Sequence, residues 1–163
     1  MIKRLLAFLI LLAIPATLFA KGGVVSAADP RAAEAGREIL RQGGTASDAA
    51  IAMMLALTVV EPQSSGIGGG GFMVHSDGKT GAIGTIDGRE TAPASATPDL
   101  FIGADGKPMP FIDAAPGGRS VGVPGNIALA ARASTRWGKL RWSALFRPAI
   151  RLAENGYQVT PRL

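Results

Sequence analysis

The chain has 163 residues, a length typical of one domain, and its 47% of apolar residues suffice for a core and exclude wholesale disorder. The formal net charge is +5, but the basic residues are scattered and not interleaved with aromatic ones, which argues against a nucleic-acid-binding protein. The absence of cysteine excludes disulfides, a thiol nucleophile and a cysteine-ligated metal, and the single histidine, His75, argues against a histidine-built metal site or triad. We expect neither a metal nor a cofactor.

Residues 1–20 have the composition of a targeting signal. Lys3 and Arg4 precede a long apolar stretch, and Ala20 is a small residue suited to a cleavage site. An uncleaved anchor helix is the alternative, but the apolar run is shorter than the ~20 residues that a membrane span requires. We therefore predict cleavage before Lys21, no membrane association after cleavage, and a periplasmic or secreted protein.

The first part of the mature chain predicts a strand followed by a helix. Residues 22–28 (GGVVSAA) are apolar and partly β-branched, which favours a buried strand. Asp29 and Pro30 match an N-cap followed by a first-turn proline, so a helix is expected over about residues 30–42 and should end at Gly43. The residues expected to face inward are Ala33, Ile39 and Leu40, and those expected outward are Arg31, Glu34, Arg37, Glu38 and Arg41.

A second helix is predicted after Gly44. Thr45 and Asp48 have the spacing of a capping box, with aspartate in place of the usual glutamate. Residues 49–60 are apolar except for Thr58, and a helix that is apolar all round is buried on all sides or lies in a membrane. Twelve residues span only about 18 Å, too little to cross a bilayer. We expect a central core helix that ends at Glu61–Pro62.

A glycine-rich turn and a hairpin are expected next. Four consecutive glycines end the stretch Gly66–Gly71, and such a run marks backbone that needs positive φ or close approach by another group. Residues 71–76 and 82–87 are predicted to be strands, joined by a turn at 77–81 that contains Asp-Gly.

The remaining third of the chain predicts loops and then helices. Residues 88–122 are rich in Pro, Gly, Asp and Ala, so mostly loop with short strands is expected. Helices are predicted from about Val123 to Trp137 and over about residues 143–154, the second with a possible kink at Pro148. Thr160 and Pro161 match the start of a further helix just before the last residue, a pattern that predicts a truncated chain.

Several short motifs carry little weight. Gly66–Gly71 contains G-x-G-x-x-G, but a helix precedes it and a strand follows, which is the reverse of a dinucleotide-binding turn. Residues 76–79 match S-x-x-K, but in a hairpin turn instead of a helix start. Ser64 and Ser65 lack a G-x-S-x-G context and a nearby base, so loop hydroxyls are favoured over a nucleophile, and His75 is favoured as a structural side chain.

Arg89 is the one side chain with a specific binding hypothesis. It stands between Asp87 and Glu90, so a surface charge or an ion-pair partner of either carboxylate is an ordinary role. Its planar guanidinium is also the group best shaped to hold a substrate carboxylate through two hydrogen bonds. Composition alone leaves both roles open.

Several blocks taken together resemble the γ-glutamyltranspeptidase family: GGVVSAADP, QGGTASDAAIAMMLALTVVEPQSSGIGGGGFMV, DGRETAP, VGVPG and PAIRLAENGYQVTPRL. The resemblance extends from Gly22 to Leu163. It implies an α/β (α+β) protein with the αββα sandwich of N-terminal-nucleophile hydrolases, of which residues 21–163 would be the N-terminal part of the large-subunit region. Family members are similar in cutting themselves into two subunits, and the N-terminal threonine of the small subunit attacks γ-glutamyl amides such as glutathione.

The resemblance also implies roles for this chain. Arg89 corresponds to the family arginine that binds the α-carboxylate of the γ-glutamyl group. No catalytic residue falls within the chain, so the missing small-subunit region is an expected partner and the fragment alone is expected to be inactive. The alternatives are a cephalosporin or glutaryl acylase of the same superfamily, and a non-catalytic periplasmic remnant or binding module.

Overall fold

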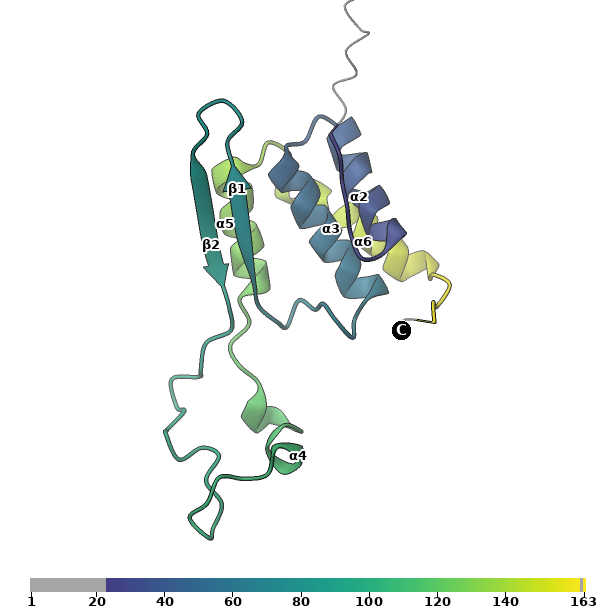
Figure 1. The fold of residues 1–163 in the computed structure, drawn as a ribbon. Helices are drawn as coiled ribbons and strands as arrows, with labels where there is room; N and C mark the ends of the chain where they lie inside the picture. Colours follow the sequence, from purple (N-terminus) through teal and green to yellow (C-terminus); the bar gives the residue numbers. More distant parts are fainter. Residues whose placement is uncertain (1–22, 162) are drawn as a thin grey trace, which may run out of the picture.

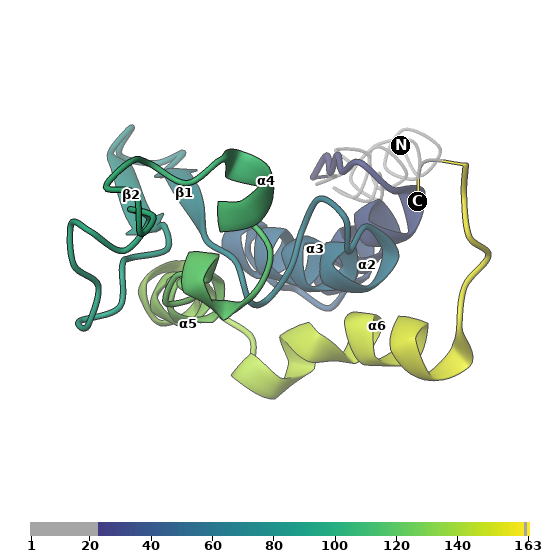
Figure 2. The ribbon, with the colours of Figure 1, turned by 90° about the horizontal axis from the view of Figure 1, so that it is seen from below.

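The computed structural model describes residues 23–161 and Leu163, so the predicted signal at 1–20 lies outside the described residues. The elements, in chain order, are α2 (Pro30–Arg41), α3 (Ala46–Val60), β1 (Gly71–Ser76), β2 (Ile83–Gly88), α4 (Phe111–Ala114), the 3-10 turn Gly118–Ser120, α5 (Asn126–Trp137) and α6 (Trp142–Asn155). Helices α2, α3 and α6 form one group, and α5 packs against both α3 and the hairpin (Figure 1). Figure 2 shows α6 crossing one side of α2 and α3. No helix in the described part is long and apolar enough to span a membrane.

Helix α3 is the central core helix, as predicted. Its capping box is formed: the Thr45 hydroxyl accepts from Asp48 N at 3.1 Å, and Asp48 Oδ2 accepts from Thr45 N at 2.9 Å. The helix packs against α2, α5 and α6. Burial of its apolar side chains is the main contribution of this helix to folding. The buried residues of α3 are Ser47, Asp48, Ala49, Ile51, Ala52, Leu55, Ala56 and Val60.

Asp48 also joins α3 to the loop between α5 and α6. Its side chain is fully buried, and Oδ2 accepts from Lys139 N at 2.9 Å and from Leu140 N at 3.3 Å. A Cβ at Gly138 would lie 2.7 Å from Asp48 Oδ1, so only glycine lets the loop approach this carboxylate closely. The same contacts that cap α3 therefore fix the end of α5.

The predicted strand at 22–28 was wrong for its described part, residues 23–28. The segment has no ladder partner, and Val24 is 94% exposed. A β-branched run adopts a strand only where another strand can pair with it, and this one lies beside α2 instead. Gly23 contacts Leu40 there, and Val25 lies close to Gly36.

Helix α2 begins and ends close to the predicted residues, and of the three residues predicted to face inward, Ile39 is buried while Leu40 is half-buried. Ala33 is only half-buried, and the fully packed face is Ala32, Ala35, Gly36 and Ile39. A Cβ at Gly36 would lie 2.7 Å from the Met53 side chain, so small residues here let α2 and α3 approach closely. The sequence prediction did not include Ala32, Ala35 and Gly36, the small residues of this close contact.

The hairpin has one packed and one exposed face. β1 and β2 are antiparallel with Phe72 opposite Asp87 and Val74 opposite Thr85, and β2 lies one residue later than predicted. Met73 and Ile86 face α5. On the opposite face Phe72 is 67% exposed and Val74 71% exposed.

The remaining segments form fewer regular elements. Residues 89–125 leave the hairpin, extend away from the helices and return to α5 (Figure 1), with Thr91 bridged to Val123. α5 begins at Asn126, three residues later than predicted, and Pro148 lies buried inside α6. The helix predicted at Thr160–Pro161 is not formed in the described residues. Only a turn is present at Pro161.

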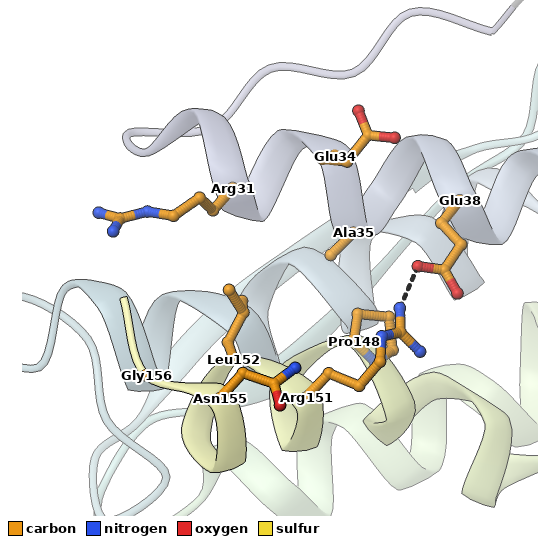
Figure 3. A pocket seen from close by; sticks show the side chains of 9 residues that line it. All are labelled: Arg31, Glu34, Ala35, Glu38, Pro148, Arg151, Leu152, Asn155 and Gly156. Atoms are coloured by element: carbon orange, nitrogen blue, oxygen red, sulfur yellow. Dashed lines mark hydrogen bonds and ion pairs between the residues drawn. The ribbon is translucent and has the colours of Figure 1, made fainter. Parts of the chain in front are cut away.

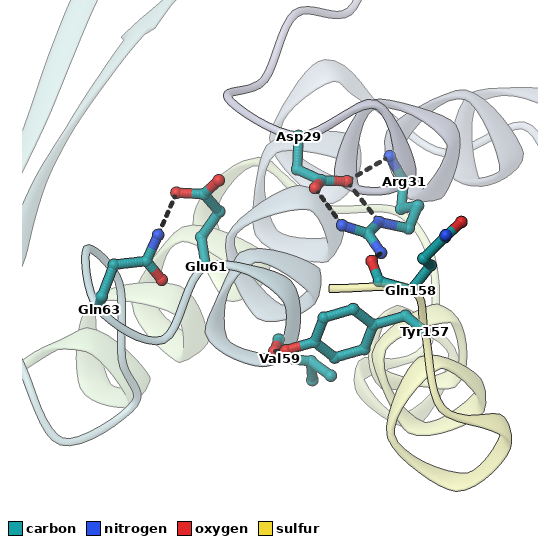
Figure 4. A network of polar contacts seen from close by, with 7 residues as sticks. All are labelled: Asp29, Arg31, Val59, Glu61, Gln63, Tyr157 and Gln158. Carbon is teal, nitrogen blue, oxygen red and sulfur yellow. Dashed lines mark hydrogen bonds and ion pairs between the residues drawn. The ribbon is translucent and has the colours of Figure 1, made fainter. Parts of the chain in front are cut away.

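An ion pair ties the start of α2 to the last described residues (Figure 4). Asp29 caps α2 through the Arg31 N–H, and the Arg31 Nε and Nη2 donate to its two oxygens at 2.8 and 2.5 Å. Arg31 also donates to Gln158 O at 2.8 Å and stacks on the Tyr157 ring, whose hydroxyl donates to Val59 O at 2.7 Å. The Arg31 hydrogen bonds hold the pKa of Asp29 below its ordinary value, against the opposing effect of burial.

We expect this ion pair to make folding stability dependent on acid pH. A lowered carboxylate pKa in the folded state contributes stability above the unfolded-state value of about 3.9, and that stability is lost as pH falls through the folded-state pKa. Between about pH 5 and pH 3, the unfolding free energy of Asp29→Asn should therefore fall less than that of the wild-type protein, as measured by urea titration. Arg31→Gln should have the same effect, whereas Arg132→Gln, an exposed change on α5, should keep the wild-type pH dependence. An unchanged slope in Asp29→Asn would contradict the assignment.

Candidate functional site

Three backbone segments cross at the end of the hairpin that leads to Arg89. They are the glycine loop 66–71, residues 88–90 after β2, and residues 122–126 before α5. A Cβ at Gly125 would lie 2.0 Å from Gly88 O, so this crossing requires glycine. The backbone immediately before Arg89 is thereby held against the start of α5.

Close approach, and not positive φ, explains the glycine loop. None of the glycines from 66 to 71 has a positive φ. A Cβ at Gly70 would lie 2.6 Å from Glu90 N and 2.7 Å from Gly88 O, both backbone atoms that cannot move aside easily. Gly68, by contrast, has open space around it. The run therefore contains at least one glycine that the packing demands and one that it tolerates.

Asn126 is a site residue that the sequence reasoning missed. Its Nδ2 donates to Gly66 O at 2.7 Å, and the backbone N–H groups of Gly125 and Asn126 both donate to Gly69 O at 3.1 Å. The side chain is nearly buried, so these bonds fix the glycine loop to the first turn of α5. A polar residue just after Val-Pro-Gly was the available signal, but its partner lies 60 residues away in sequence.

Arg89 lies at the exit from β2 with an exposed side chain. Its backbone N–H donates to Asp87 Oδ1 at 2.9 Å, so Asp87 orients the main chain and not the guanidinium. Within the described residues, no ion pair involves the Arg89 guanidinium. A Cβ at Gly70 would lie 2.5 Å from Glu90 Oε2, which places the Glu90 carboxylate over the glycine loop.

Two neighbouring pockets share Glu90 in their walls. The first has a volume of about 390 Å³, is lined by both Arg89 and Arg119, and continues along residues 90–93 and 120–122. The second, of about 340 Å³, lies over the glycine loop and is lined by Ser64, Ser65 and Asn126. The two serines thus border a pocket next to the one that Arg89 lines.

His75 is not part of this site. It lies on the inner face of β1, where its ring stacks on Trp137 at a centroid distance of 4.5 Å. Its Nδ1 lies 3.1 Å from the hydroxyl of the buried Ser47. Both contacts join the hairpin to the helices, which agrees with the structural role expected for this residue.

A third pocket, between α2 and α6, has a different character (Figure 3). Its volume is about 330 Å³, and the Arg151 guanidinium on one wall forms an ion pair with Glu38 on the other. Glu34 is likewise paired with Arg37 and Arg41. Each charged residue that lines this pocket has an ion-pair partner, whereas Arg89 and Arg119 have none in the described part of the chain.

The backbone crossing predicts opposite results for two substitutions in one loop. Gly70→Ala should lower the unfolding free energy by about 1–3 kcal/mol, because the new methyl group must displace backbone atoms. Gly68→Ala should leave it unchanged or raise it by up to ~1 kcal/mol, because the methyl group meets no atom and the unfolded chain loses freedom. Urea unfolding of both variants measures the difference, and equal stabilities would show that the crossing is looser than described.

The family model for γ-glutamyltranspeptidase matches residues 32–163. The chain is 48% identical over 139 residues to the glutathione hydrolase proenzyme of Bacillus subtilis strain 168, covering 85% of this chain and 24% of that protein. It therefore spans about a quarter of the length of that relative.

Solved structures show the same fold. The γ-glutamyltranspeptidase from Pseudomonas nitroreducens in complex with L-DON superposes with a TM-score of 0.82 at 38% identity, covering 87% of this chain and 42% of that one. A cephalosporin acylase from Bacillus halodurans superposes with a TM-score of 0.66 at 39% identity, covering 80% of this chain and 23% of that one. The predicted fold class is confirmed, with helices and a small antiparallel sheet as the N-terminal portion of an N-terminal-nucleophile hydrolase fold. The chain belongs to the γ-glutamyltranspeptidase family.

Proposed function

We propose that this chain is the N-terminal part of the large-subunit region of an exported γ-glutamyltranspeptidase that acts on glutathione and related γ-glutamyl amides. In this proposal Arg89 binds the α-carboxylate of the γ-glutamyl group. The nucleophile, an N-terminal threonine, belongs to a small-subunit region outside these 163 residues. The chain by itself should then release nothing from a γ-glutamyl anilide.

One observation carries the binding role of Arg89. Arg89 lines a pocket beside the glycine loop, and its guanidinium has no ion-pair partner in the described part of the chain. An unpaired arginine on a rigid backbone is the arrangement that a ligand carboxylate needs, because both planar N–H donors remain free. The Gly88–Gly125 crossing and the Asp87 hydrogen bond supply that rigidity.

The remaining site residues have supporting roles in this proposal. Asn126 and Gly70 hold the glycine loop beside the pocket, and Glu90 lies between loop and strand. With the α-carboxylate fixed, the γ-amide carbonyl is presented to the threonine hydroxyl, whose proton passes to the threonine's own α-amine. Attack forms an ester and expels the amine, and water or an acceptor amine then cleaves the ester.

Two rival functions remain distinct from this one. A cephalosporin-type acylase would cleave a different amide but could still bind a side-chain carboxylate of its substrate through Arg89. The similarity to the Bacillus halodurans acylase supports this alternative. A non-catalytic periplasmic remnant or binding module would have no small subunit at all. Reading the gene beyond the Leu163 codon separates this last rival, since only an enzyme requires an in-frame threonine-initiated region.

Export follows from the predicted signal at residues 1–20. We infer that the mature protein begins near Lys21 and lies in the periplasm or outside the cell. The composition of the mature part, with no cysteine, is compatible with either compartment.

Arg89→Lys in the matured two-subunit enzyme tests the proposed function. Lysine keeps the charge but loses the planar fork, so kcat/KM for glutathione should fall by about 30- to 150-fold, equivalent to about 2–3 kcal/mol. Thermal stability should not change, because the guanidinium has no ion pair to lose among the described residues. Steady-state kinetics and a thermal melt measure the two effects.

Arg132→Lys is the matched control, since it changes an exposed arginine on α5 away from both pockets. It should leave kcat/KM at the wild-type value. An Arg89→Lys enzyme with wild-type kinetics, or one that loses stability without losing substrate affinity, would show that Arg89 is structural.

A further inference from the structure

Arg119 is a second unpaired arginine in the pocket that Arg89 lines. It belongs to the 3-10 turn Gly118–Ser120, and its side chain is exposed. Its Nη1 lies 3.2 Å from the Sδ of Met109, and a thioether is a weak acceptor. No carboxylate pairs with Arg119 in the part of the chain that the structure describes. Most of its N–H donors therefore remain available to a ligand.

Arg89 and Arg119 enter the pocket from opposite ends. Thr91 pairs antiparallel with Val123, so the residues that precede each of them run away from the bridge in opposite directions. Arg89 stands two residues before Thr91, and Arg119 four residues before Val123. At about 3.3 Å per extended residue, the two backbones lie at most about 20 Å apart, and the 3-10 turn shortens this distance.

The charge of the pocket suits a ligand with two negative groups. Arg89 and Arg119 both line a volume of about 390 Å³, within the range of pockets for small ligands. The carboxylate in the wall, Glu90, is turned toward the glycine loop, where a Cβ at Gly70 would lie 2.5 Å from its Oε2. Neither arginine has an ion pair among the described residues, so a ligand with two negative groups would supply a partner to each.

We propose that Arg119 recognises a second carboxylate of the substrate, so that the complete enzyme prefers γ-glutamyl peptides whose leaving group carries a carboxylate over neutral γ-glutamyl amides. This inference rests on the proposed function, in which Arg89 holds the α-carboxylate. Glutathione has the required pair, one carboxylate on the γ-glutamyl residue and one on the C-terminal glycine. Its peptide backbone spans about 10 Å when extended, so the two groups can reach separate arginines.

The chemistry of the pocket also specifies which kinetic constant Arg119 affects. The second carboxylate is remote from the amide that is cleaved, and its charge does not change during attack by the nucleophile. An interaction that is equally strong in the ground state and the transition state lowers KM and leaves kcat unchanged. Arg119 is therefore a specificity-determining residue and not a catalytic one.

The test compares glutathione with its C-terminal amide in the matured two-subunit enzyme. Arg119→Met removes the charge and retains an unbranched side chain of similar reach. It should raise KM for glutathione by roughly 3- to 10-fold, the range expected for a partly exposed charge pair. The kcat for glutathione, and both KM and kcat for the amide, should stay within about 2-fold of the wild-type values. Equal changes for the two substrates, or none for either, would overturn the proposal.

Two controls separate this inference from the proposed function. Arg132→Met should change neither substrate, because Arg132 lies outside the pocket. Arg89→Lys should impair glutathione and its amide alike, since both carry the α-carboxylate. If Arg89→Lys impairs both while Arg119→Met impairs neither, the second carboxylate site fails and the proposed function stands. If Arg89→Lys impairs neither, the proposed function itself fails.

A measurement on the unaltered enzyme tests the proposal even if the Arg119 variant does not mature into two subunits. In the unaltered enzyme, the KM of the amide should exceed that of glutathione at about 0.05 M salt, and the ratio should approach one at about 0.5 M salt, because ions screen exposed charges. A ratio of one at low salt would overturn the proposal.

Discussion

The site depends on a backbone crossing that only glycine permits. At Gly125 a Cβ would lie 2.0 Å from Gly88 O, and at Gly70 it would lie 2.6 Å from Glu90 N. These contacts bring the glycine loop, the end of β2 and the start of α5 within hydrogen-bonding distance, and Asn126 then joins the first to the third. Arg89 follows this crossing directly, so its backbone is fixed by packing even though its side chain is exposed.

The crossing is anchored in turn by the buried core. α5 carries Leu129 against Gly88, and its other end is tied through the loop at Lys139 to the buried carboxylate of Asp48. Because Asp48 also caps α3, one set of hydrogen bonds fixes both the start of α3 and the loop that follows α5. Asp48 thus holds the C-terminal end of α5, and the glycine loop is hydrogen-bonded to its N-terminal end.

The parts predicted from sequence were those with local causes. Thr45 with Asp48, Asp29 with Pro30, and Gly43 after α2 each act within a few residues, and each ended or began a helix near the predicted position. The strand at 22–28 failed because strand formation depends on a distant partner. Asn126 was missed for the same reason, since its hydrogen-bond partner, Gly66, lies far away in the chain.

Because Arg89 is exposed in this chain, other parts of a complete enzyme must shield its guanidinium from water. Two opposite charges 4 Å apart attract by about 1 kcal/mol in water and by about 4 kcal/mol at the effective dielectric of a partly enclosed site. This chain leaves the Arg89 pocket open and the outer face of the hairpin, with Phe72 and Val74, uncovered. On the proposed function, the small-subunit region would contribute the nucleophile and also exclude water from the arginine. This chain fixes the position of the Arg89 guanidinium, and the exclusion of water around that group determines how strongly it binds a carboxylate.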